Sequence, residues 1–507
     1  MDFIIDHLLS LILFIPVAGA VIITLLPKDQ VGAIRWVALI TTLFPLGLSL
    51  VLWTRFDSHA AGFQFVEQAP WFTVINSSYH LGVDGISVAM ILLTAILMPL
   101  AVLFSFSITE KVKAYMALFL LLGTGMFGVF MTLDLILFFL FWEAGLIPMY
   151  FLINIWGSAN RQYASFKFFI YTMAGSLGLL LAIQTIGITL GSFDMLNAIE
   201  KWPTFAGAIY GIPATTIRAA AFWAFTIAFA IKVPVWPFHT WLPDAHTEAP
   251  TAGSMILAGV LLKLGAYGFL RLVLPLYPAE AKFYAGALAF LALMAIVAGA
   301  LASFGQTDFK RLVAYSSVGH MGFVVLGIAV AAVARDSEIF KGHAIMAANG
   351  AVLQMFNHGL SSAGMFLLVG VIYDRTHTRN LNDFGGLFPL APVYGGILIF
   401  TSMASLGLPG LNGFVSEFMV VRGAWPVYTV ITAIGMLGLL MTGAYILKGI
   451  QKVLHGPVNQ RWAGHRLEIS RREVIAIAPL LALMLVIGVW PAWLVSVINA
   501  AITRMMG

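Results

Sequence analysis

Long apolar stretches separated by short polar segments dominate the sequence. Runs of about 20 mostly apolar residues match an α-helix that crosses a bilayer, whereas a membrane β-barrel would show shorter segments of alternating polarity. This rule predicts fourteen spans, which begin near Phe3, Ala33, Gly82, Ala114, Leu133, Tyr163, Thr216, Thr251, Phe283, Leu312, Ile345, Val393, Val427 and Val474. The pattern therefore predicts an all-α polytopic membrane protein of about 14 transmembrane helices.

The composition narrows the class of protein further. Hydrophobic residues make up 61% of the 507 positions and charged residues only 10%, against about 25% charged in soluble domains. These values exclude a soluble enzyme, a disordered chain and a secreted disulfide scaffold. The sequence contains no cysteine, which excludes thiol chemistry and cysteine-ligated zinc or iron–sulfur clusters within this chain.

Lysine and arginine are distributed unevenly between the two sides of the predicted membrane. The loops that follow odd-numbered spans (odd loops) hold sixteen, and the even loops and the termini hold nine, Arg271 among them. The positive-inside rule then places the odd loops in the cytoplasm and both termini on the periplasmic side. The net charge of +5 is explained by loops that face anionic lipid, so we expect no nucleic-acid partner.

Four ionisable residues lie inside predicted spans, where burying a charge costs several kcal/mol and therefore marks a candidate functional site. They are Glu143, Lys232, Lys263 and Glu417. Lys232 is followed at once by Pro234 and Pro237, which cannot continue the helical hydrogen-bond ladder. Glu417 follows a similar interruption at Pro409. The two breaks fall in spans 7 and 12, and a five-helix unit repeated once must be inverted, as is typical of transporters.

Two histidines add to this polar row. His320 lies in the tenth span and His358 in the eleventh, and a neutral imidazole can accept and release a proton near neutral pH. We interpret the row as a proton relay. The alternatives are that Glu143 and Lys232 form a structural clamp and that each histidine is a hydrogen-bonded core residue.

A metal or nucleotide site is not expected in this chain. His239, His246 and Glu248 lie close in sequence, but their spacing fits no zinc motif. The sequence contains neither a phosphate-binding loop nor a dinucleotide fingerprint.

Four segments together resemble one known family. They are residues 232–251 (KVPVWPFHTWLPDAHTEAPT), 262–268 (LKLGAYG), 308–322 (DFKRLVAYSSVGHMG) and 408–418 (LPGLNGFVSEF). They resemble the antiporter-like membrane subunits of respiratory complex I, the proton-pumping NADH:quinone oxidoreductase. Glu417 favours the NuoM type (chain 4), because a lysine is expected there in the other antiporter-like subunits. The resemblance spans roughly residues 110 to 455.

The resemblance implies an organisation and a role for each candidate residue. Spans 4–8 and 9–13 would form the two inverted repeats, with helices 7 and 12 broken. The chain would divide into residues 1–110 (helices 1–3), 111–275 (first repeat), 276–455 (second repeat) and 456–507 (cytoplasmic connector and helix 14). Glu143 would pair with Lys232, Lys263 would be the central lysine, His320 and His358 would bridge, and Glu417 would be the exit acid.

The same resemblance implies a function as part of a larger complex. The chain would translocate protons, driven by electron transfer from NADH to quinone in other subunits, and would perform no redox chemistry itself. FMN, iron–sulfur clusters and quinone would be bound by those other subunits. Expected partners are membrane-arm subunits, with antiporter-like neighbours on both sides, and membrane lipids.

Two other functions are compatible with the sequence. One is a subunit of a multisubunit cation/proton antiporter, and the other is a passive membrane scaffold. For the location, the inner membrane of a bacterial cell is favoured over that of a mitochondrion.

Overall fold

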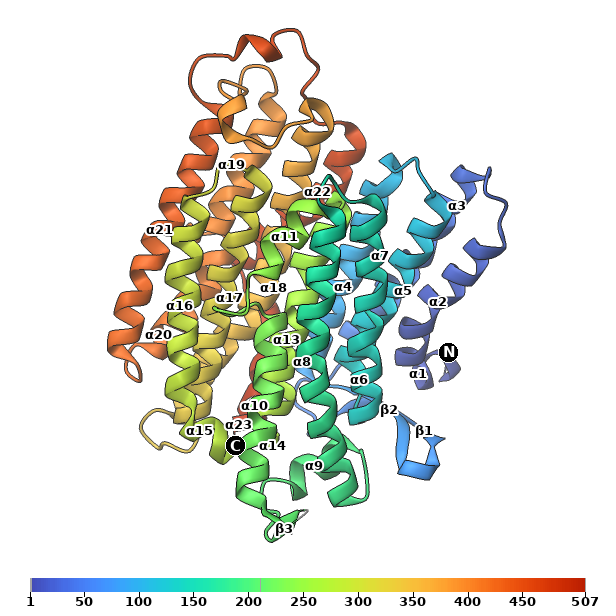
Figure 1. The fold of residues 1–507 in the computed structure, drawn as a ribbon, viewed down its shortest axis with the longest axis vertical. Helices are drawn as coiled ribbons and strands as arrows, with labels where there is room; N and C mark the ends of the chain where they lie inside the picture. Colours follow the sequence, from blue (N-terminus) through green and yellow to red (C-terminus); the bar gives the residue numbers. More distant parts are fainter. Residues whose placement is uncertain (1, 210, 507) are drawn as a thin grey trace.

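The protein is a bundle of long helices that run roughly along one axis (Figure 1). The structure is a computed structural model and describes residues 2–209 and 211–506. Thirteen of the described helices are long and apolar enough to cross a membrane. The predicted polytopic α-helical membrane fold is therefore confirmed.

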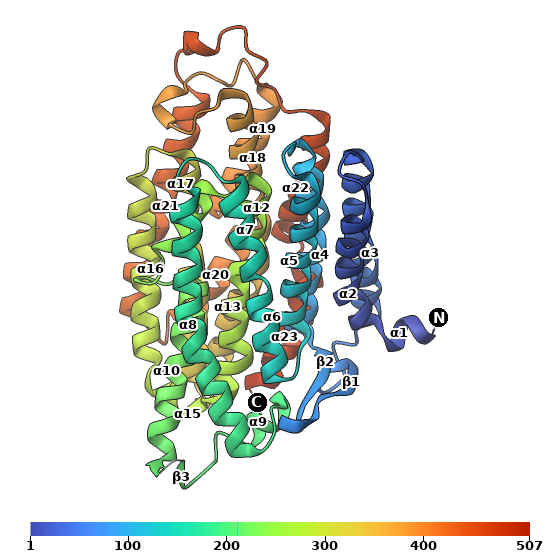
Figure 2. The same ribbon diagram turned by 45° about the vertical axis from the view of Figure 1, so that its right-hand side comes forward.

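The N-terminal part pairs three apolar helices with a β-hairpin. Its elements are α1 (Asp2–Asp6), α2 (Leu8–Leu25), α3 (Val31–Arg55), β1 (Gln64–Phe72), η1 (Thr73–Ile75), β2 (Ser77–Val83), α4 (Gly85–Phe104) and η2 (Ser105–Ser107). Helix α4 begins where it does because the Asp84 carboxylate accepts hydrogen bonds from the backbone N–H groups of Ile86 and Ser87. The antiparallel hairpin β1–β2 lies beside the lower ends of these helices (Figure 2).

The middle of the chain contains the first broken helix. Its elements are α5 (Val112–Met131), α6 (Leu135–Ala144), α7 (Leu146–Trp156), α8 (Arg161–Leu190), α9 (Met195–Lys201), β3 (Ala208–Ile209), β4 (Ile212–Pro213), α10 (Ala214–Lys232), α11 (Trp241–Glu248), α12 (Thr251–Ile256), η3 (Leu257–Leu261), α13 (Leu262–Gly268), η4 (Phe269–Val273) and α14 (Leu274–Leu276). The elements from α12 to α14 form one continuous span, in which η3 and η4 are π-helical turns.

The C-terminal part contains the second broken helix. Its elements are α15 (Pro278–Phe283), α16 (Ala285–Phe304), α17 (Phe309–Ala334), α18 (Lys341–Thr376), η5 (Leu381–Asp383), α19 (Pro392–Leu406), α20 (Asn412–Ala424), α21 (Thr429–Leu454), η6 (Gln460–Trp462), α22 (Arg471–Val489) and α23 (Ala492–Met506). Helix α18 lies at the centre, since it packs against helices from every part of the chain, including α4, α12, α17, α20 and α22.

Both predicted helix breaks are present. Helix α10 ends at Lys232, and α11 resumes at Trp241 after the proline-rich turn. Helix α19 ends at Leu406, and Gly407 (φ +83°) and Gly410 (φ +93°) then adopt left-handed conformations that favour glycine. Because this second break divides span 12 into two short helices, thirteen of the helices in the described part of the chain meet the length of a full span, one fewer than predicted. The inverted repeat stays a prediction.

Hydrogen bonds between loops show that alternate loops meet at opposite ends of the bundle. At one end, which we call the odd-loop end, Lys113 donates to the Leu26 carbonyl, and Lys448 donates to the carbonyls of Phe304 and Gln306. At the even-loop end, His80 of the hairpin contacts Asp194, which precedes α9. Both chain ends lie in the lower half of the view in Figure 1, opposite the segment 456–470. Which end faces the cytoplasm stays a prediction.

The C-terminal segment differs from the single helix that the sequence predicts. Helix α22 ends at Val489, and a separate helix α23 follows from Ala492. Pro491 lies between them and has no backbone N–H to donate to the preceding turn. Both helices pack against α4 and α18, so the C-terminal segment joins the first helices to the centre of the bundle.

Candidate functional site: a buried row of ionisable side chains

Lys263 is fully buried in the middle of its span, between the two π-helical turns. Its ammonium group donates to the carbonyl of Ala258, five residues earlier, and lies 2.7 Å from Nδ1 of His358. Single π-helical turns occur frequently at functional sites, where they change the direction in which side chains point. The structure thus places Lys263 in direct contact with His358 of α18.

A close approach of two helices makes this contact possible. Gly359 follows His358, and a Cβ atom at Gly359 would lie only 2.9 Å from the carbonyl oxygen of Gly259. Real Cβ atoms do not come so near to a backbone oxygen, so only glycine allows α18 to approach η3 this closely. The glycine pair therefore sets the distance across which Lys263 reaches His358.

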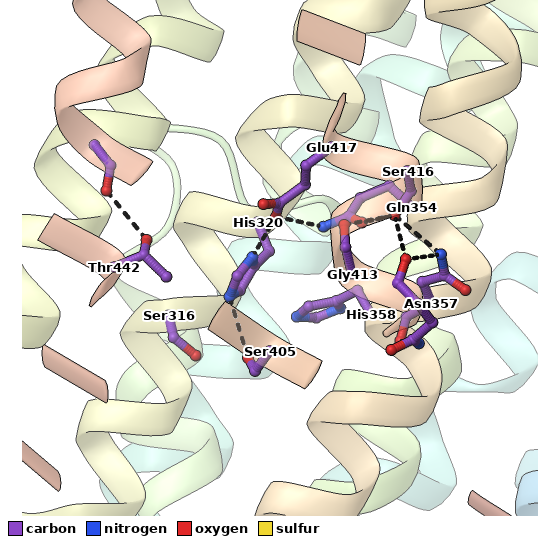
Figure 3. A network of polar contacts seen from close by, with 12 residues as sticks. Ser316, His320, Gln354, Asn357, His358, Ser405, Gly413, Ser416, Glu417 and Thr442 are labelled. Atoms are coloured by element: carbon purple, nitrogen blue, oxygen red, sulfur yellow. Dashed lines mark hydrogen bonds and ion pairs between the residues drawn. The ribbon is translucent and has the colours of Figure 1, made fainter. Parts of the chain in front are cut away.

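His320 and Glu417 form the second contact of the row. Nδ1 of His320 lies 2.7 Å from Oε1 of Glu417, and both side chains are buried. Gln354 donates to the same carboxylate oxygen at 2.9 Å. Figure 3 shows these side chains converging from α17, α18 and α20. Glu417 lies on the helix that begins directly after the second break.

The contact of Lys263 with His358 lies next to the contact of His320 with Glu417. The imidazole rings of His320 and His358 have centroids 5.6 Å apart, so the order along the row is Lys263, His358, His320 and Glu417. Each of these groups can hold or release a proton. Lys263 lies at hydrogen-bond distance from His358, and His320 from Glu417, whereas the two imidazole rings make no direct hydrogen bond to each other. Four of the six predicted residues therefore lie in one buried row.

A network of neutral side chains fixes the broken helix beside this row. Asn357 of α18 donates to the Asn412 carbonyl and to the Ser416 hydroxyl, and Asn412 donates back to the Asn357 carbonyl. Ser416 also donates to the side-chain oxygen of Gln354. Figure 3 shows this network next to Glu417. The sequence pattern does not predict these residues, because amides and hydroxyls in an apolar span give no signal comparable to a charge.

The other two predicted residues lie apart from the row. The Lys232 ammonium lies over the ring of Trp142, 4.7 Å from its centroid, and is not in ion-pair contact with Glu143. The predicted pair of Glu143 and Lys232 is therefore not in direct contact in this structure. A Cβ at Gly265 would lie 3.0 Å from the Lys232 Cβ. The helix of Lys263 thus packs directly on the helix of Lys232.

His246 and His239, the two histidines close together in sequence, lie in different surroundings. The ring of His246 stacks on Phe366 with centroids 4.3 Å apart, and the ring of His239 faces Tyr315 at 6.1 Å. Within residues 2–209 and 211–506, no group of three potential ligands lies close enough together to hold a metal ion.

One assignment from the sequence was wrong. Arg271 was counted with the even loops, but it lies within the span that contains Lys263 and is buried. Its guanidinium contacts the Asp84 carboxylate at 2.6 Å and also the hydroxyl groups of Tyr267 and Ser87. Arg271 lies near the end of an apolar run, and its acidic partner is distant in sequence, so the pattern gave no sign that both are buried.

Comparisons with known proteins agree with this arrangement. Residues 132–442 match the family described as NADH:quinone oxidoreductase/Mrp antiporter, TM. NADH-quinone oxidoreductase subunit M of Rhodobacter capsulatus is 40% identical over 516 residues, which cover 99% of this chain and 96% of that protein. NADH-ubiquinone oxidoreductase chain 4 of Marchantia polymorpha is 35% identical over 501 residues, which cover 98% of this chain and 97% of that protein.

Solved structures share the fold. A chain of respiratory complex I from Thermus thermophilus with bound NADH superposes with a TM-score of 0.85 at 27% identity, and the match covers 98% of this chain and 100% of that one. A chain of the Mrp complex from Dietzia sp. has a TM-score of 0.84 at 18% identity, and the match covers 99% of this chain and 98% of that one. At this low identity, the match shows a common fold alone. Together with the sequence relatives, these matches confirm the predicted resemblance. The chain belongs to the family of antiporter-like membrane subunits of NADH:quinone oxidoreductase, in the branch of subunit M.

Proposed function

We propose that this chain translocates protons across the membrane as subunit M of NADH:quinone oxidoreductase. The observation that carries the proposal is the buried row of Lys263, His358, His320 and Glu417, which ends on the second broken helix. Four ionisable groups buried in one apolar bundle are costly, and such groups inside membranes mark ion and proton pathways.

The proposed mechanism uses proton transfers alone. A proton that leaves the Lys263 ammonium is accepted by the imidazole of His358, passes to His320, and is then accepted by the Glu417 carboxylate. Lys232 lies on the helix packed against that of Lys263, so a change in its charge favours or disfavours the protonated form of Lys263. Glu143 acts on Lys232 in the same way and would receive the signal from a neighbouring subunit.

The energy comes from elsewhere in the complex. Electrons would pass from NADH through FMN and iron–sulfur clusters to quinone in other subunits. Antiporter-like subunits would lie on both sides of this chain in the membrane arm. We place the odd-loop end in the cytoplasm and both termini in the periplasm of a bacterial cell, because the odd loops hold most of the lysine and arginine.

Variants of the row test the proposal in the assembled complex. We expect Lys263→Ala and Glu417→Ala to lower the number of protons pumped per NADH oxidised, while oxidation by uncoupled membranes continues. The measurement is proton uptake into inverted membrane vesicles after a pulse of NADH. Lys282→Ala is the matched control, since its exposed ammonium contacts Asp336 at the surface, away from the row.

The alternatives give different results. A passive scaffold predicts that both variants assemble and pump normally. An independent cation/proton antiporter predicts sodium-driven proton exchange without NADH, and no co-purification with flavin and iron–sulfur subunits. The sequence relatives favour neither alternative.

A further inference from the structure

We propose that His246 carries protons between a cavity at the odd-loop end and the paired side chains of Lys263 and His358. This inference rests on the proposed function and adds the route by which the row exchanges protons with one side of the membrane. Four features of the structure carry it: the surroundings of His246, its level in the bundle, the cavity and the residues between His246 and His358.

His246 is a buried ionisable side chain without a hydrogen-bond partner. It is 0% exposed, and neither ring nitrogen has a partner among the residues that the structure describes. Burying unpaired polar nitrogens is unfavourable. A purely structural aromatic side chain at this position would avoid that cost, so the imidazole is retained at a cost to stability, as expected for a group that exchanges protons.

The position of His246 lies between the odd-loop end and the row. Its ring stacks on Phe366 of α18. Phe366 is eight residues from His358, or about 12 Å along the helix axis, and ten residues from Thr376 at the odd-loop end. His246 therefore lies at a level of α18 between His358 and the odd-loop end.

A cavity of about 170 Å³ lies on the odd-loop side of His246. Its lining includes Glu248 and Lys310, which are buried, and Asp374, which is exposed. The lining also includes Gly370, one helical turn beyond Phe366. The ring of His246 thus lies about one helical turn from a cavity that is lined by acidic and basic groups, on the side of that cavity that faces the row.

A hydroxyl group lies on the way from His246 to the row. Ser362 is one turn from Phe366 in one direction and one turn from His358 in the other, and residues four apart are neighbours on a helix surface. Its side chain is buried and currently donates to the His358 carbonyl. Nε2 of His358 has no partner among the described residues. The Ser362 hydroxyl can accept one proton and donate another, which leaves it unchanged.

The step at His246 involves only the transfer of a proton. One ring nitrogen accepts a proton from the cavity side, and its new N–H bond forms as the donor's bond breaks. The other nitrogen then releases its proton toward Ser362 and His358. The imidazole returns to the neutral form, so no other reactant is required.

Three variants in the complete complex test this role. We expect His246→Phe, which keeps the stacking on Phe366, to lower the protons pumped per NADH to the value of Lys263→Ala. His246→Gln keeps a polar group but cannot relay a proton, and it should give the same value. His239→Phe is the matched control, because His239 lies in the turn just before α11 and faces Tyr315, and it should pump as the wild type does.

Chemical rescue separates proton transfer from a structural role. Free imidazole added to vesicles that carry His246→Ala should restore pumping, and it should not restore pumping in Lys263→Ala. Assembly is followed for each variant by the amount of complex in native gels. If assembled His246→Gln pumps as the wild type does, the role of His246 is overturned. If Lys263→Ala also pumps normally, the proposed function itself fails.

Discussion

The two oxygens of the Glu417 carboxylate have different surroundings. Oε1 accepts hydrogen bonds from His320 and Gln354, whereas Oε2 has no partner among the described residues. A carboxylate held in this way is oriented by one oxygen and leaves the other free to exchange a proton. Gln354 is thus a positioning residue for the last member of the row.

Gln354→Leu should impair proton pumping without abolishing it. The substitution removes one hydrogen bond to a charged group, worth about 1.5–3 kcal/mol, and leaves the bond from His320. We expect the protons pumped per NADH to fall between the values of the wild type and of Glu417→Ala. Gln184→Leu, on the peripheral helix α8, is the control and should have no effect. Equal loss in both leucine variants would show that hydrophobic substitution alone is responsible.

At the scale of elements, the row depends on how closely two spans approach. The carbonyl of Gly259 and the backbone of Gly359 leave no room for a side chain. The π-helical turns on either side of Lys263 then direct its side chain toward α18. Helix geometry, as much as residue identity, brings the lysine and the histidine together.

Gly359→Ala should therefore separate Lys263 from His358. A methyl group at this position forces α18 and η3 apart, and such overpacking costs about 1–3 kcal/mol. We expect fewer pumped protons per NADH and a lower melting temperature of the purified complex. Gly342→Ala in the same helix meets no atom within 4 Å and should leave both quantities unchanged. A normal melting temperature for Gly359→Ala would contradict the close approach.

The contact of the β-hairpin with the α9 region should depend on pH. Burial of Asp194 by itself raises the pKa of its carboxyl, but the hydrogen bonds from His80 and from the Asn197 N–H hold that pKa below its usual value. A lowered pKa in the folded state means that the contact stabilises the protein above the unfolded pKa of about 3.9 and loses this effect as pH falls through the folded value.

Asp194→Asn measures this contribution. The variant should melt at a lower temperature than the wild type at pH 7, and the difference should shrink as the pH falls below 4. Thermal melting of the purified complex measures the difference in melting temperature between variant and wild type at each pH. A difference that is independent of pH would show that the carboxylate charge has no part in the contact.

At the scale of the whole molecule, buried ion pairs join parts of the chain that are distant in sequence. Arg271 contacts Asp84 at the start of α4, and a cluster with Tyr267 and Ser87 surrounds the pair. This joins the N-terminal helices to the span of Lys263 near the even-loop end. Such a pair holds the helices in place and is not part of the row.

Breaking this pair should destabilise the chain more than replacing it. Arg271→Leu leaves the Asp84 charge buried without its partner, and such a loss costs about 3–5 kcal/mol. We expect the amount of assembled complex to fall strongly. The double variant Arg271→Leu with Asp84→Asn should recover part of it, because no unpaired charge remains buried. Equal assembly of the single and double variants would contradict this account.

The sequence by itself determined the membrane-spanning helices, both helix breaks and three of the buried charged residues, Lys232, Lys263 and Glu417. Hydrophobic length and proline position decide these features locally, because every backbone polar group in a membrane must be satisfied within its own helix. The resemblance to a known family then supplied the predicted roles of Lys263, His320, His358 and Glu417.

Only the tertiary structure decided which of these groups touch. The sequence did not show that Lys263 reaches His358, that Glu143 and Lys232 are not in contact, that Arg271 is buried with Asp84, or that His246 lies unpartnered beneath a cavity. These facts depend on the close approach of helices that are far apart in the chain. That approach is set by packing at glycines and by the direction of side chains, neither of which leaves a periodic signal in the sequence.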